Sequence, residues 1–148
     1  YSEGSGKIGD EDTEKKSIFS NPDKGAKVYQ FSDIQNIIQE IDGNTDGPIL
    51  VDVREPGEYN LGHIPKSINI PLKTAPGALD LDEEEFEEVF GFKKPDHSRK
   101  LIFYCQAGVR STTAEELAAT FGYQNRGNYV GSYQDWVDRK GKIEGGSA

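Results

Sequence analysis

The stretch that decides the fold is 101–111, LIFYCQAGVRS. Its first four residues form an apolar run without alternation, which is typical of a strand buried on both faces of a parallel sheet. The only cysteine of the chain, Cys105, follows this run directly. Residues 112–121 are rich in Ala, Glu and Leu and therefore favour a helix. A lone thiol thus stands where a central strand ends and a helix begins, which is where ligands bind in open α/β sheets.

The surroundings of Cys105 favour a reactive thiolate. A free cysteine has a pKa of about 8.5, and helix N-termini and nearby cations lower it. The backbone N–H groups of the loop and the guanidinium of Arg110 supply both influences, and the same donors suit a small bound oxyanion. The alternative is a small buried apolar side chain, which is the common role of a free cysteine. The succession of strand, cysteine, glycine-containing loop, arginine and helix favours the nucleophile.

The pattern Cys-x-x-Gly-x-Arg-Ser at residues 105–111 resembles the active-site loop of the rhodaneses, the thiosulfate sulfurtransferases. Three further stretches resemble that family in the same order: 51–55 (VDVRE), 58–71 (EYNLGHIPKSINIP) and 128–136 (NYVGSYQDW). The resemblance covers residues 28–141. It implies a rhodanese-like α/β fold, with a five-stranded, mostly parallel sheet and helices on both faces.

The order of elements along the chain predicts the same architecture. Short strand patterns lie at 28–29, 48–53, 66–70, 101–104 and 128–130, and helical patterns follow most of them, the last one capped by Ser132. Strands interleaved with helices indicate a parallel sheet covered on both faces. We expect a disordered leader over 1–27, the rhodanese domain over 28–141 and a flexible tail over 142–148. The absence of methionine, even at position 1, predicts a processed chain.

Loop length separates the chemistries that this superfamily supports. The loop from Cys105 to Arg110 has the six residues of a rhodanese, whereas related phosphatases and arsenate reductases have one residue more. The resemblance therefore implies that Cys105 accepts a sulfane sulfur from a small anionic donor such as thiosulfate, or from a persulfide. The acceptor it implies is cyanide or a thiol such as glutathione or thioredoxin. The residues expected to line the substrate site are Gln106, Ala107, Gly108, Val109, Arg110 and Ser111.

Asp52 and Arg54 alternate with valines at the end of the second predicted strand. We expect them to support the active loop through charge-assisted hydrogen bonds rather than to touch the substrate. His63 has the side chain of a general base, but the resemblance assigns it to a structural turn. The loop has no cation before Arg110, whereas many rhodaneses hold the thiosulfate sulfonate with one. An organic persulfide therefore stays open as the natural donor.

Composition excludes several other classes of function. A net charge of −9 disfavours nucleic acid and anionic membranes as partners. One cysteine and two distant histidines offer no metal-ligand spacing, so we expect neither a metal nor a cofactor. No apolar run reaches the length of a transmembrane helix. The resemblance implies a monomer in mitochondria, with the cytoplasm as the other location. A persulfide carrier or binding module with little turnover stays open, as does a phosphatase or arsenate reductase.

Overall fold

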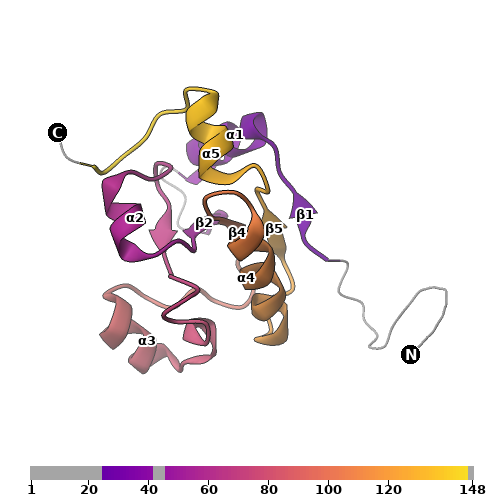
Figure 1. Cartoon of the computed structure of the whole chain (residues 1–148). Helices are drawn as coiled ribbons and strands as arrows, with labels where there is room; N and C mark the ends of the chain where they lie inside the picture. Colours follow the sequence, from indigo (N-terminus) through magenta and orange to yellow (C-terminus); the bar gives the residue numbers. More distant parts are fainter. Residues whose placement is uncertain (1–24, 42–45, 147–148) are drawn as a thin grey trace.

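The computed structural model describes residues 25–41 and 46–146, and a five-stranded sheet of order β1-β5-β4-β2-β3 forms its centre (Figure 1). Every pairing in this sheet is parallel. The strands are β1 Lys27–Val28, β2 Ile49–Asp52, β3 Ile68–Asn69, β4 Leu101–Tyr104 and β5 Arg126–Asn128. The helices are α1 Phe31–Ile41, α2 Pro56–Leu61, α3 Glu83–Phe90, α4 Val109–Thr120 and α5 Ser132–Asp138, with the short 3-10 helix η2 at Ala78–Asp80.

Alternation along the strands builds one apolar core on each face of the sheet. In β4, Leu101 and Phe103 pack with side chains of η2, α3 and α4. Ile102 and Tyr104 point the other way and pack with α1 and α5. All four residues of β4 are buried because both faces of the strand are covered. This explains why the apolar run 101–104 shows no alternation with polar residues. The predicted fold, a parallel sheet with helices on both faces, is confirmed.

Two helices near the thiol differ from the expectation, one in where it begins and one in being present at all. The helix expected from residue 112 begins at Val109, so Arg110 and Ser111 lie in the first turn of α4. Helix α2 was not predicted, because it is short and lies in a turn-rich stretch. Its first turn is stabilised by the backbone N–H of Glu55, which donates to the carboxylate of Glu58 at 3.0 Å.

The predicted leader lies outside the described residues as far as position 24. Strand β1 begins at Lys27, where it pairs with Gly127 of β5. The boundary expected after residue 27 therefore falls inside this strand.

The C-terminal segment 142–146 contacts the domain, although it was expected to belong to a flexible tail. His63 and Glu144 exchange two backbone hydrogen bonds of 2.9 Å each. The indole N–H of Trp136 donates to the carbonyl of Lys142 at 2.7 Å. These bonds extend the contacts of the domain beyond residue 141.

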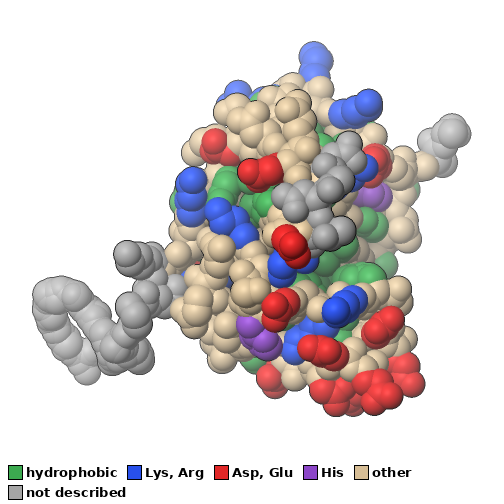
Figure 2. Space-filling view, turned by 180° about the vertical axis from the view of Figure 1, so that it is seen from behind, with side chains coloured by type: hydrophobic (Ala, Val, Ile, Leu, Met, Phe, Trp, Pro, Cys, Tyr) green, Lys and Arg blue, Asp and Glu red, His purple; other side chains and the backbone are tan. Residues whose placement is uncertain are grey.

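The acidic side chains of α3 gather at one end of the molecule (Figure 2). Figure 1 shows α3 level with the carboxyl end of α4 and away from its amino end. Among residues 25–41 and 46–146, no helix is both long enough and apolar enough to cross a bilayer.

Candidate active site

Cys105 directly follows β4, and its sulfur lies at the amino end of α4. The backbone N–H of Gly108 donates to this sulfur at 3.0 Å. Gly108 has φ +96°, and a Cβ built on it would lie 2.5 Å from the carbonyl oxygen of Val130. Both the backbone conformation and the space therefore require glycine here. The tight turn at Gly108 aims the loop amides at the thiol.

Burial and hydrogen bonding act in opposite directions on the Cys105 thiol. Burial is the largest single influence and would raise the pKa. The backbone N–H and hydroxyl of Ser111, whose hydroxyl also donates to the Gly108 carbonyl at 3.2 Å, and the N–H groups of Gly108 and Ala107 lower the pKa. Their sum outweighs burial, so the thiol has a pKa below its ordinary value. The loop therefore favours the thiolate, which is the nucleophilic form.

Ser132 lies against Cys105 from the amino end of α5, a contact that the sequence did not predict. Its hydroxyl accepts a hydrogen bond from the Cys105 N–H at 3.1 Å and lies 3.9 Å from the sulfur. The same hydroxyl donates to the carbonyl of Tyr129 at 2.9 Å. The Tyr133 N–H donates to the Cys105 carbonyl, also at 2.9 Å. The expectation that Ser132 caps α5 is wrong, because Gly131 holds the cap position without a side-chain hydrogen bond and the Ser132 hydroxyl is engaged by Cys105 and Tyr129.

Asp52 and Arg54 form a buried ion pair below the loop, with 2.8 Å between Arg54 Nη2 and Asp52 Oδ2. Burial lowers the pKa of Arg54 most, but hydrogen bonding and charge attraction from Asp52 raise it overall. Arg54 Nη1 also donates to the side-chain oxygen of Gln106 at 3.4 Å. Its guanidinium lies 4.2 Å from the centre of the Tyr133 ring. Arg54 thus connects β2 to the active loop and to α5.

Arg110 forms a two-pronged ion pair with Glu58 of α2. The distances are 2.8 Å from Nη1 to Oε1 and 3.1 Å from Nη2 to Oε2. The hydrogen bond from Arg110 is the largest cause that lowers the pKa of Glu58, to about 2. The two side chains are 31% and 38% exposed, so the pair lies at the rim of the site. The sequence signal for Glu58 was its place two residues after the helix-starting Pro56, in capping-box spacing with Glu55.

The other predicted loop residues also surround the thiol, in different orientations. Val109 is 77% exposed, Ala107 is exposed, and Ser111 is fully buried. The side-chain amide of Gln106 donates to Gln134 of α5 at 3.3 Å. The structure thus brings these residues together around one sulfur atom, and their roles toward a substrate stay predictions.

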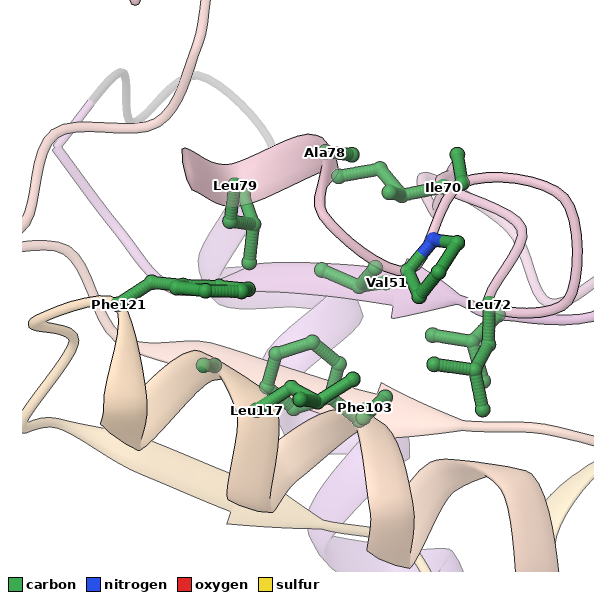
Figure 3. A pocket seen from close by; sticks show the side chains of 13 residues that line it. Val51, Ile70, Leu72, Ala78, Leu79, Phe103, Leu117 and Phe121 are labelled. Carbon is green, nitrogen blue, oxygen red and sulfur yellow. The ribbon is translucent and has the colours of Figure 1, made fainter. Parts of the chain in front are cut away.

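A separate apolar crevice lies between the sheet, α4 and the segment that contains η2 (Figure 3). Its labelled lining includes Val51, Leu79, Phe103 and Leu117. All of its lining side chains are apolar, and Cys105 is not among them. It offers no hydrogen-bonding side chain to an anionic sulfur donor, so we treat it as a packing gap of the core.

Residues 33–139 match the family model of the rhodanese-like domain. The chain belongs to the rhodanese family. A mitochondrial thiosulfate sulfurtransferase of Saccharomyces cerevisiae is 48% identical to this rhodanese over 118 residues, 80% of this chain and 77% of that protein. A thiosulfate:glutathione sulfurtransferase of the same yeast is 46% identical over 113 residues, 76% of this chain and 79% of that protein.

Solved structures of single-domain sulfurtransferases also resemble this rhodanese. One from Saccharomyces cerevisiae superposes with a TM-score of 0.71 at 46% identity, covering 81% of this chain and 95% of that chain. A human one gives a TM-score of 0.70 at 29% identity, covering 78% of this chain and 99% of that chain. The predicted rhodanese family and sulfurtransferase class are confirmed.

Proposed function

We propose that this rhodanese takes the sulfane sulfur of thiosulfate on Cys105 and passes it to the thiol of glutathione. The observation that carries this proposal is the buried Cys105 sulfur, which accepts a hydrogen bond from the Gly108 N–H and has a lowered pKa. The names of the two yeast relatives support thiosulfate as the donor, and one of them supports glutathione as the acceptor. The word mitochondrial in the first name supports the same location for this chain.

In the first half-reaction, the Cys105 thiolate attacks the outer sulfur of thiosulfate. A Cys–S–S bond forms, the sulfur–sulfur bond of the donor breaks, and sulfite leaves with the electron pair of that bond. The product is a persulfide anion on Cys105. The N–H groups of Ala107, Gly108 and Ser111, which stabilise the thiolate, are placed to stabilise this anion as well.

In the second half-reaction, the glutathione thiolate attacks the terminal sulfur of the persulfide. Glutathione persulfide leaves, and Cys105 regains its thiolate. The lowered pKa of Cys105 assists this step, because a thiol of lower pKa is a better leaving group.

The experiment follows both products with purified protein, thiosulfate and glutathione. We expect stoichiometric sulfite and glutathione persulfide from wild type, and neither product from Cys105→Ser with an unchanged circular dichroism spectrum. Substantial turnover by Cys105→Ser would contradict the mechanism. Sulfite release in a single burst without glutathione persulfide would instead indicate a persulfide carrier or a protein thiol acceptor such as thioredoxin.

A further inference from the structure

Glu58 is held at the rim of the active loop by hydrogen bonds from two directions. Its carboxylate accepts a hydrogen bond from each terminal nitrogen of Arg110, at 2.8 and 3.1 Å. It also accepts the backbone N–H of Glu55 at 3.0 Å, which fixes it in the first turn of α2. A carboxylate bound in this way keeps its position and its negative charge beside the loop.

This ion pair changes what the site offers to an anionic donor. Arg110 is the only cation in residues 105–111. Glu58 occupies the Nη1/Nη2 edge of its guanidinium, one of the two edges that can give a carboxylate or sulfonate two parallel hydrogen bonds. The other arginine near the thiol, Arg54, is buried and paired with Asp52. A dianion that approaches the loop therefore has to displace Glu58 or bind next to its charge, and both are unfavourable.

We propose that Glu58 is a specificity-determining residue, which weakens the binding of dianionic thiosulfate and favours sulfane donors that carry one negative charge. This inference rests on the proposed function, because it concerns the donor step at Cys105. The favoured class comprises organic thiosulfonates and organic persulfides. With a thiosulfonate, the Cys105 thiolate takes the outer sulfur and the organic sulfinate leaves with the electron pair, so charge balances as it does with thiosulfate.

The test compares KM for two donors, thiosulfate and the monoanion methanethiosulfonate, in wild type and in Glu58→Gln. The amide oxygen of glutamine can still accept the Glu55 N–H, so α2 keeps its first turn, while the negative charge and one of the two hydrogen bonds from Arg110 are lost. We expect KM for thiosulfate to fall by roughly threefold to tenfold and KM for methanethiosulfonate to change by less than about twofold. The preference between the two donors should therefore shift toward thiosulfate.

Glu55→Gln is the matched control. Glu55 lies three residues earlier and shares the capping box of α2 with Glu58, but its carboxylate accepts hydrogen bonds from the backbone N–H groups of Glu58 and of Lys73, the latter at 3.2 Å, rather than from Arg110. The Glu55→Gln variant loses the same charge as Glu58→Gln. We expect its ratio of KM for thiosulfate to KM for methanethiosulfonate to stay as in wild type. Glu58→Asn serves as a second neutral variant if Glu58→Gln does not fold.

An unchanged or higher KM for thiosulfate in folded Glu58→Gln would overturn the proposal, and so would an equal fall for both donors. The proposal would also be overturned if Glu55→Gln shifted the preference toward thiosulfate as much as Glu58→Gln does. Intact mass after incubation with saturating donor keeps this result separate from the proposed function. A gain of one sulfur by all variants shows that sulfur transfer works, whether or not Glu58 sets the preference.

Discussion

At Cys105, burial opposes ionisation while hydrogen-bond donors of the active loop promote it. The contacts of Ser111 lead the influences that lower the pKa, and the charge of Arg110 is paired with Glu58. Hydrogen bonds to the thiolate act directly on the sulfur, whereas the charge of Arg110 is offset by the carboxylate paired with it. The hydrogen bonds therefore lower the pKa of Cys105 more than Arg110 does. The sequence pointed to both the loop amides and Arg110, and the structure ranks the local donors first.

Ser111→Ala should therefore raise the pKa of Cys105 more than Arg110→Ala does. Alkylation by iodoacetamide requires the thiolate, so its rate in wild type should rise at a lower pH than for a free cysteine. The midpoint of this rise should move to higher pH in Ser111→Ala and move less in Arg110→Ala. Thr113→Ala, on the exposed side of the same helix, is the control and should titrate like wild type. A common midpoint for Ser111→Ala and wild type would show that the serine does not stabilise the thiolate.

At the scale of single elements, three helix starts meet around the thiol. Helix α4 supplies the loop amides, α5 supplies Ser132, and α2 supplies Glu58. The loop before α4 depends on Gly108, whose backbone lies in the left-handed region and approaches Val130 closely. The shape of the turn, its packing against Val130 and the direction of the loop N–H groups therefore all depend on Gly108.

Gly108→Ala should distort the loop and weaken both stability and turnover. We expect a loss of about 1–3 kcal/mol in the free energy of unfolding, from backbone strain and the contact with the Val130 carbonyl. Turnover should fall by at least about tenfold, because small displacements of catalytic donors are costly. The control is Gly77→Ala, where an added Cβ meets no atom within 4 Å. Urea unfolding and sulfite release measure the two effects, and a fully active, equally stable Gly108→Ala would refute this role.

Elements with a strong apolar period were predictable from the sequence, and elements held by polar contacts were not. The strand before Cys105 and the helix after it follow from apolar and helix-forming runs. The last strand was expected at 128–130 but lies at Arg126–Asn128. Its first residue is an arginine buried through a 2.8 Å ion pair with Glu115 of α4, and a hydrophobic pattern cannot indicate such a charge. Helix α2, with its Glu58, escaped prediction because it is held by a capping box and tertiary contacts.

At the scale of the whole molecule, the strand order places β4 between β5 and β2, so Cys105 emerges near the middle of the sheet. Residues from both halves of the chain then converge on it: Arg54 from the segment after β2, and Ser132 from α5. The sequence indicated this convergence through four family-like stretches, but their spacing could not predict which side chains touch. The C-terminal segment 142–146 is hydrogen-bonded to the domain at His63 and Trp136.

Truncation after Gly141 should destabilise the domain, because it removes the partners of His63 and of the Trp136 indole. Loss of these partly buried hydrogen bonds should lower the free energy of unfolding by about 1–3 kcal/mol. The control is Lys142→Ala in the full chain, which keeps the carbonyl that accepts the indole N–H. Urea unfolding curves compare the three proteins. Equal midpoints for the truncated and full chains would mean that residues 142–146 add no stability.

The central claim is that Cys105 carries the transferred sulfur, and intact mass tests it most directly. The protein is incubated with thiosulfate, freed of excess donor without reductant and weighed by mass spectrometry. We predict that wild type gains the mass of one sulfur atom, that glutathione removes this gain, and that Cys105→Ser never acquires it. An unchanged wild-type mass under saturating thiosulfate, or an equal gain by Cys105→Ser, would contradict the account.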